Sequence, residues 1–324
     1  MQNFIEGFKR HSLGYTLLFI LLILPIITQN RVLLSVMVMC VLYSYLALSW
    51  NLIGGYGGQF SLAHGAFFGL GAYTTGILFT KFGITPWVGL LIGGFIAAIL
   101  GYIIGNLTFS FGLKGFFFLL VTLAITQFFM EVSKNIDFIG GPRGLWLPAK
   151  IGWYYFQFRG RIEYYYIIFA FMLIAIIITY LIEKSKLGYY LVAIREDEDA
   201  AEACGVDSKK CKTLTFALSG FLTGIGGGYY IQLFFFIDPF SAFSIHLNIY
   251  IVLMVIVGGT GTIGGPIIGA FFFVILSELL RFIPMQSQLL AAITKSIFAI
   301  ALILVAIYFN KGIISLRYIA KYLK

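Results

Sequence analysis

The chain of 324 residues is 60% hydrophobic and 11% charged, with a mean hydropathy of +0.96. Soluble domains carry about 25% charged residues, so this composition excludes a water-soluble globular protein and predicts one integral-membrane domain over residues 1–324. The net charge of +9 does not indicate a nucleic-acid-binding protein, because the basic residues are scattered between apolar segments and form no continuous basic face.

Apolar runs recur along the chain, and many are long enough to cross about 30 Å of hydrocarbon, which takes roughly 20 helical residues. We expect membrane spans near residues 12–28, 32–53, 60–80, 84–106, 115–133, 164–183, 212–236 and 289–310. Two shorter runs, 245–257 and 266–280, flank a glycine-rich break. The predicted fold is an all-α, polytopic transmembrane helical bundle of about 8–10 spans with broken or re-entrant glycine-rich segments.

The first apolar run follows Lys9, Arg10 and His11 and superficially resembles a secretory signal. No small-residue cleavage site follows this run, so we expect an uncleaved first span. In the resulting topology both termini share one side of the membrane with a loop of about 184–211, and that side holds the larger share of Lys and Arg. The positive-inside rule therefore places these parts in the cytoplasm and a loop of about 134–163 outside.

Glycine interrupts the apolar segments in both halves of the chain, at 54–58 and at 258–265. Discontinuous helices at corresponding places in two halves indicate the translocation site of a transporter. The alternative for many glycines is close helix packing, for which Gly224, Gly226, Gly227 and Gly228 are candidates.

The second break also contains Gly259-x-Gly261-x-x-Gly264, with Glu278 nineteen residues after its first glycine. We interpret this match to the dinucleotide fingerprint as false, because the fingerprint needs an α/β sheet and this region reads as membrane helix. The chain contains no P-loop sequence, and its histidines and three cysteines show no metal-ligand or disulfide spacing. We therefore expect no catalytic residue, metal or cofactor in this chain, and any ATP and Mg²⁺ would be used by partner subunits.

Charge is dense only between Glu183 and Lys212. Alanine and glutamate favour a helix over 195–205, acidic residues near its start suit the helix dipole, and Gly205 suits its C-terminal cap. We predict a short helix on the cytoplasmic surface, with a solvated connecting loop as the alternative.

Within this segment, Asp199-Ala200-Ala201-x3-Gly205 resembles the Glu-Ala-Ala-x3-Gly loop of ATP-binding cassette (ABC) importer permeases, with Asp in place of Glu. The sequence departs from the fuller motif at Thr215, which points away from maltose-type permeases. The resemblance implies a coupling helix that docks into an ATPase subunit. The implied coupling residues are Arg195, Glu196, Asp197, Asp199, Ala200, Ala201 and Gly205.

A series of blocks closely resembles LivM-type permeases of the branched-chain amino acid ABC transporter family. The blocks run in family order at 51–73, 114–124, 140–144, 185–197 and 258–270. The resemblance implies two cytoplasmic ABC ATPase subunits, a second homologous permease, an extracytoplasmic solute-binding protein and a bacterial inner-membrane location.

Several residues of the glycine-rich breaks and of the polar block near them are candidates for lining the translocation pathway. Polar groups at membrane depth are costly unless they form hydrogen bonds or face a wet cavity, so hydrogen bonding between packed helices is the alternative role. Glu131 is expected at the membrane interface. The candidates are Asn51, Gly54, Gly57, Gln59, Ser61, His64, Thr122, Gly259, Gly261 and Gly264.

These features together favour the permease subunit of an importer of branched-chain amino acids. It would alternate between inward and outward access under the control of a partner ATPase. An importer of urea or short amides is the nearest alternative, because related permeases share the blocks. An autonomous channel or secondary transporter is a different class, which predicts buried ionisable residues for ion coupling.

Overall fold

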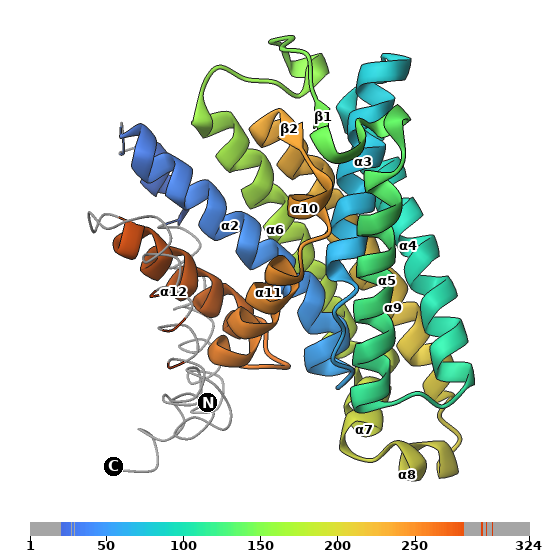
Figure 1. Cartoon of the computed structure of the whole chain (residues 1–324). Helices are drawn as coiled ribbons and strands as arrows, with labels where there is room; N and C mark the ends of the chain where they lie inside the picture. The colour runs from blue at the N-terminus through green and yellow to red at the C-terminus, as the bar shows by residue number, and fades with distance from the viewer. Residues whose placement is uncertain are drawn as a thin grey trace, which may run out of the picture.

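The computed structural model describes residues 21–26, 28, 30–281, 293, 296 and 300, and it is almost entirely helical (Figure 1). A π-helical turn, Leu52–Tyr56, directly follows the first long helix. The α-helices in chain order are α2 (Arg31–Asn51), α3 (His64–Phe82), α4 (Pro86–Ser110), α5 (Gly115–Lys134), α6 (Arg161–Lys184), α7 (Lys186–Glu196), α8 (Glu198–Ala203), α9 (Ser208–Phe234), α10 (Pro239–Ala242), α11 (Ile245–Gly258) and α12 (Gly264–Arg281).

The predicted all-α membrane bundle is confirmed. Five stretches of the described chain are long and apolar enough to cross a membrane: Arg31–Tyr56, Pro86–Ser110, Gly115–Lys134, Arg161–Lys184 and Pro239–Gly258. The predicted shorter pair, 245–257 and 266–280, corresponds to α11 and α12. The predicted spans 12–28 and 289–310 lie mostly outside the described residues.

The predicted span ends lie within a few residues of the helix ends, and two of the differences have a local cause. The span expected from residue 60 begins only at His64, because the chain after the π-helical turn is irregular until α3 starts. The helix that contains the span expected from residue 212 begins at Ser208, because the carboxylate of Asp207 accepts a hydrogen bond from the backbone N–H of Lys210 at 2.9 Å and caps α9.

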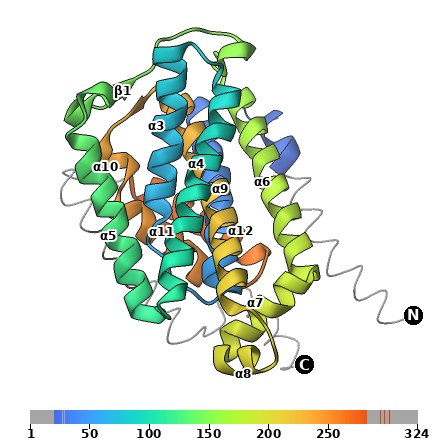
Figure 2. The same cartoon turned by 90° about the vertical axis from the view of Figure 1, so that its right-hand side faces the viewer.

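The core of the bundle is formed by α3, α4 and α9, which pack side by side (Figures 1 and 2). Glycine permits this close approach: a Cβ on Gly93 of α4 would lie 2.9 Å from the carbonyl oxygen of Gly71 on α3. Gly224 and Gly227 of α9 meet α4 and α3 in the same way, which confirms their predicted packing role. Since α3 and α9 are largely enclosed by other helices, they can carry small and polar residues that a lipid-facing helix could not.

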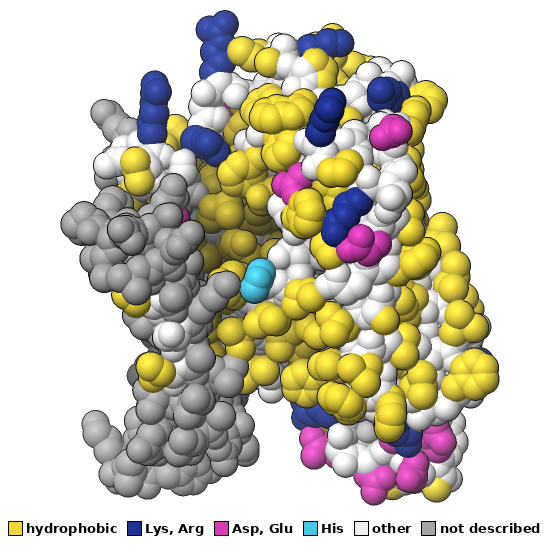
Figure 3. Space-filling model, in the orientation of Figure 1, with side chains coloured by type: hydrophobic (Ala, Val, Ile, Leu, Met, Phe, Trp, Pro, Cys, Tyr) yellow, Lys and Arg dark blue, Asp and Glu magenta, His cyan; other side chains and the backbone are white. Residues whose placement is uncertain are grey.

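The outer face of α4 shows how the chain meets lipid. Large apolar side chains are exposed at every fourth position, on one side of the helix: Leu91, Phe95, Ile99, Ile103 and Leu107. Hydrophobic side chains likewise cover the middle of the face in Figure 3, whereas acidic side chains gather at the end formed by α7 and α8. An apolar band of this kind requires a hydrocarbon solvent.

The two hydrophilic loops lie at opposite ends of the bundle, with α7 and α8 at one end and the 135–160 segment at the other (Figures 1 and 2). The 135–160 segment contains three 3₁₀ turns, Asp137–Ile139, Gly141–Arg143 and Trp153–Tyr155, and the short strand β1 (Leu145–Trp146). Strand β1 pairs antiparallel with β2 (Phe236–Ile237), which follows α9. The exposed rings of Trp146, Trp153 and Tyr154 fit the expected membrane interface.

Candidate functional site

The two glycine-rich breaks, far apart in the sequence, meet at the side chain of Asn51. This residue ends α2, and its Nδ2 donates to the carbonyl oxygen of Thr262 at 2.9 Å. Its Oδ1 accepts from the backbone N–H of Gly261, also at 2.9 Å. Asn51 is fully buried, so one amide side chain binds both a free carbonyl and a free N–H of the second break.

Glycine is needed where the two breaks touch. A Cβ on Gly55 would collide with the Asn51 side chain and would lie 2.6 Å from the backbone nitrogen of Gly261. Gly261 itself has φ +67°, a conformation that glycine adopts most easily. The π-helical turn that precedes this contact carries Gly54 and Gly55, and it widens the end of α2. We call the contact of residues 51–58 with residues 259–264 the junction.

Arg195 reaches the junction from α7. Its Nη1 donates to the carbonyl oxygen of Gly55 at 3.0 Å. A Cβ on Gly58 would lie 2.6 Å from Cγ of Arg195, and one on Gly261 would lie 2.7 Å from Nη1. The same guanidinium donates to Glu196 through Nη2 at 2.9 Å. One side chain of the predicted coupling segment therefore touches both helix breaks.

A second contact ties the junction to α6. The hydroxyl of Tyr56, at the end of the π-helical turn, donates to Oε2 of Glu183 at 3.1 Å. Glu183 lies in the last turn of α6, just before the chain enters α7. The end of α6, from which the predicted coupling segment continues, is thus bound to the first break, which Arg195 also contacts.

The coupling segment itself is not the single helix expected over 195–205. It is divided into α7 and α8, because Asp197 adopts an extended backbone (φ −156°, ψ 107°) and its carboxylate accepts from the backbone N–H of Ala200 at 3.0 Å. An Asp that caps a new helix cannot continue the previous one. Gly205, with φ +86°, follows the end of α8 in the left-handed conformation that the sequence predicted for its cap.

Ion pairs hold α8 between α5 and α9. Glu198 pairs with Lys212 of α9 and, at 3.4 Å, with Lys114 at the start of α5, which also lies 3.1 Å from Asp199. Burial acts to raise the pKa of the Glu198 carboxyl, but the hydrogen bond and charge of Lys212 outweigh it, so this pKa lies below its usual value. The hydrogen bond to Asp199 raises the pKa of the Lys114 ammonium. Ala201 packs inward from α8 while Asp199 stays exposed.

The polar block after the first break is bound from several helices. The indole nitrogen of Trp50 on α2 donates to the carbonyl oxygen of Ser61 at 2.8 Å. On α5, Thr122 Oγ1 accepts from the backbone N–H of Leu62 at 3.0 Å, and Thr126 Oγ1 donates to the carbonyl oxygen of Leu62 at 2.6 Å. The irregular segment 57–63 is therefore anchored to both α2 and α5.

His64 continues this network into α9. Ser219 donates its hydroxyl hydrogen to the carbonyl oxygen of Ser49 at 2.7 Å, so Nε2 of His64, 2.7 Å from the same hydroxyl, must act as the donor. Nδ1 of His64 and Oε1 of Gln59 are buried without a hydrogen-bond partner among the described residues. The two groups retain hydrogen-bonding capacity inside the bundle.

The structure brings together many of the predicted pathway residues, although mainly as contacts between helices. Asn51, Ser61, His64 and Thr122 are buried and bonded across elements. Gly54 and Gly57 lie in and directly after the π-helical turn, and Gly259, Gly261 and Gly264 form the turn from α11 into α12. Their role in lining a solute pathway stays a prediction.

Other members of this network were not singled out from the sequence. Asn248 of α11 accepts from the backbone N–H of Gly65 through Oδ1 at 2.7 Å, and Ser219 and Thr126 bind as described above. A polar residue within an apolar run was the available signal. Glu131, expected at the interface, is exposed and pairs with Lys134 at 2.7 Å. The described residues contain no group of three or more His, Cys, Asp or Glu that could hold a metal.

The family model for the permease component of branched-chain amino acid transport systems matches residues 32–307. The chain belongs to this family. The permease is 25% identical over 264 residues to the high-affinity branched-chain amino acid transport system permease protein LivM of Escherichia coli (strain K12), a match that covers 74% of this chain and 61% of the relative. The resemblance to LivM-type permeases is confirmed. The match thus spans less than two thirds of that relative's length.

Other relatives differ in the solute that their names give. The permease is 26% identical over 227 residues to the probable branched-chain amino acid transport permease protein LivM of Methanocaldococcus jannaschii, covering 66% of each chain. It is 24% identical over 232 residues to the fructose import permease protein FruF of Bifidobacterium longum, covering 69% of this chain and 63% of the relative. No solved structure matches the permease. The family therefore includes permeases named for amino acids and for sugars.

The junction yields a direct prediction. Replacing Asn51 with Ala removes the partner of two partly buried backbone groups, Gly261 N–H and Thr262 C=O, and each lost hydrogen bond costs about 0.5–1.5 kcal/mol. We expect Asn51→Ala to lower the thermal unfolding temperature of the permease in detergent by several degrees. Asn106→Ala on α4, away from the junction, is the matched control. Equal unfolding temperatures for Asn51→Ala and the wild type would contradict the importance of the junction.

Proposed function

We propose that this chain is the membrane-spanning permease subunit of an ABC importer that carries branched-chain amino acids across the bacterial inner membrane. The observation that carries the proposal is the contact of Arg195 with both helix breaks. It gives a partner bound at α7 and α8 a direct mechanical connection to the membrane helices. Family membership and the relatives named for branched-chain amino acid transport support the choice of solute.

The surface of the coupling segment suits a protein partner. Tyr189 and Tyr190 of α7 are exposed, and exposed carboxylates of Glu196 and Asp199 lie on the same segment. Exposed aromatic residues are enriched at protein interfaces. In the proposal, two cytoplasmic ATPases bind this segment and that of a second homologous permease, and Mg²⁺ and ATP act in those ATPases.

The proposed mechanism is alternating access. A movement of α7 on ATP binding or hydrolysis displaces Arg195, which pulls on the carbonyl of Gly55 in the π-helical turn and shifts the contact with Gly261 at the tip between α11 and α12. Since the π-helical turn and the glycine-rich tip interrupt regular helix, they are the places where the backbone can bend. An extracytoplasmic binding protein would deliver the solute, so this chain need not hold it tightly.

A second candidate is a sugar importer, because the permease is also similar to fructose and ribose import permeases. Urea or short amides form a further alternative from the sequence blocks. The test is uptake by proteoliposomes that contain the complete complex. We expect ATP-dependent accumulation of labelled L-leucine in preference to D-fructose, D-ribose and urea. Preferred accumulation of a sugar or urea would contradict the proposed solute, and uptake without ATP would indicate an autonomous transporter.

Removing the guanidinium group of Arg195 should uncouple solute transport from ATP hydrolysis in the complete complex. The lost hydrogen bond is charge-assisted, and such bonds are worth about 1.5–3 kcal/mol, which corresponds to about a ten- to hundred-fold effect. We expect Arg195→Ala to lower the amount of leucine transported per ATP hydrolysed about tenfold or more. Lys186→Ala, an exposed cation on the same helix, is the control. An unchanged ratio of transport to hydrolysis would exclude Arg195 as the coupling residue.

The side of the membrane that α8 faces can be tested with a native thiol. Cys204 follows α8 and is exposed, whereas Cys40 and Cys211 are buried. We expect a membrane-impermeant maleimide to label Cys204 in inside-out vesicles and not in right-side-out vesicles, with Cys204→Ser as the control. Labelling only from the outside would place the segment beyond the reach of a cytoplasmic ATPase. The proposal also places both termini in the cytoplasm.

A further inference from the structure

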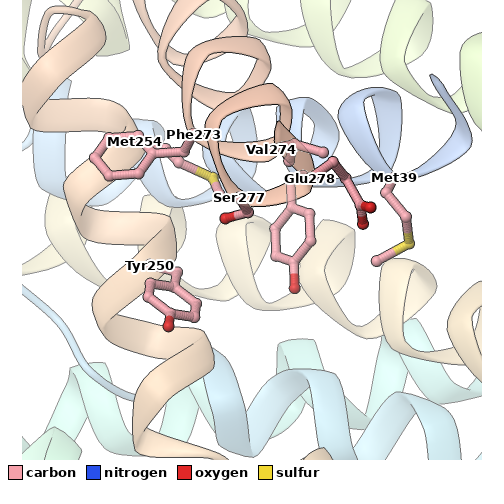
Figure 4. A pocket seen from close by; sticks show the side chains of 8 residues that line it. Met39, Tyr250, Met254, Phe273, Val274, Ser277 and Glu278 are labelled. Atoms are coloured by element: carbon pink, nitrogen blue, oxygen red, sulfur yellow. The ribbon is translucent and has the colours of Figure 1, made fainter. Parts of the chain in front are cut away.

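A cavity of about 190 Å³ lies between α2, α11 and α12 (Figure 4). Its position follows from how α11 and α12 pack. At the junction end the two backbones touch through glycine, since a Cβ on Gly258 would lie 3.0 Å from the nitrogen of Gly269 and would collide with Gly265. The cavity lies beyond this contact, at 250–254 of α11 and 273–278 of α12, where larger side chains replace glycine.

The polar lining of the cavity contains one carboxylate and three hydroxyl groups. Glu278 and Ser277 come from α12, Tyr250 from α11 and Tyr43 from near the middle of α2. An ionisable side chain inside a membrane bundle is costly, and such residues mark the pathways of solutes and ions. The residues around Glu278 on α12 are mostly apolar, so its carboxylate is the main charge that this helix brings to the cavity.

The rest of the lining is apolar and adaptable. Met39 of α2, Met254 of α11 and Phe273 of α12 lie in the wall, and Figure 4 shows labelled side chains from all three helices around one space. Methionine side chains adjust to irregular shapes. A cavity of about 150 Å³ admits benzene, so this one has room for the branched side chain of leucine, and its partly open side leaves space for the polar groups.

We propose that this cavity holds the transported amino acid during its passage, with the carboxylate of Glu278 binding the solute's ammonium group. The hydroxyl groups of Tyr43 and Tyr250 donate to the solute's carboxylate, and the apolar wall receives its branched side chain. A sugar or urea has no cationic group for Glu278. The inference rests on the proposed function, which supplies an amino acid as the solute.

The position of the cavity connects it to the junction. Its three walls are α2, α11 and α12, and the Asn51 side chain joins the end of α2 to the tip between α11 and α12. Arg195 touches the same tip. A displacement of α7 therefore changes the relation of the helices that line the cavity, which is how the ATPase cycle would release the solute.

The first test is leucine uptake by the complete complex in proteoliposomes at saturating binding protein. We expect Glu278→Gln to lower the leucine uptake rate about tenfold or more, since a charge-assisted hydrogen bond is lost. Glu278→Asp keeps the carboxylate, so we expect it to retain part of the uptake rate. ATP hydrolysis without leucine should stay within about twofold of the wild type for both. The matched control is Glu131→Gln on the exposed end of α5. The inference would be overturned if Glu278→Gln took up leucine at the wild-type rate. It would also be overturned if this variant lost leucine uptake and leucine-independent ATP hydrolysis to the same extent.

The second test follows the solute directly. Ser277→Cys, made in the complex with Cys204→Ser, places a thiol in the cavity wall. We expect L-leucine to slow its alkylation by a small water-soluble thiol reagent, D-ribose and urea to have no effect, and Glu278→Gln to abolish protection. A thiol that fails to react, or that reacts equally with and without leucine, would contradict a solute site here.

These results separate the two proposals. If the wild type and Glu278→Gln take up leucine equally well, the cavity is not the solute site, and the proposed function still stands. Absence of ATP-driven leucine uptake by the wild type rejects the proposed solute, and the cavity assignment with it.

Discussion

The hydrogen bonds between the Asn51 side chain and the turn at residues 261–262 meet a need that every buried helix break creates. A helix break frees backbone N–H and C=O groups, and these groups are costly wherever they are removed from water without a partner. Asn51 supplies one donor and one acceptor from the edge of the first break to the second. The two irregular segments therefore stabilise one another within protein, where non-helical backbone is tolerated.

Because the breaks meet at one place, a single side chain can reach both. Arg195 comes from outside the bundle core, donates to Gly55 and lies against Gly261. Its planar group provides several donors in a fixed arrangement, so it binds the carbonyl oxygen of Gly55 and the carboxylate of Glu196 at the same time. The ion pairs of Glu198 with Lys114 and Lys212 keep the neighbouring α8 in place. The predicted coupling segment is thus attached to the membrane helices by the hydrogen bond of Arg195 to Gly55 and by the ion pairs of Glu198.

In the two proposals, the junction transmits movement and the cavity between α2, α11 and α12 binds the solute, and these lie at different places in the fold. The contacts that hold the junction together are made by backbone groups, glycines and the Asn51 amide, and none of these distinguishes an amino acid from a sugar. The cavity between α2, α11 and α12 has an acidic and apolar lining, whose chemistry depends on a few side chains. A family that includes permeases named for different solutes is compatible with a shared junction and variable cavity residues.

The sequence alone determined the solvent of this protein, most of its helices, its family and the two helix breaks, because apolar run length and glycine clusters are local properties. It also predicted the polar groups Asn51, Gln59, Ser61 and His64 as costly at membrane depth, and Thr122 as a further pathway candidate. It did not reveal that Asn51 meets a turn about 210 residues away, or that Asp197 divides the coupling segment. The Asn51 contact depends on how the helices pack and rotate, because hydrogen-bond partners on separate helices have no fixed spacing in the chain. The Asp197 cap is local, but an Asp can either continue a helix or begin a new one, and the sequence did not show which.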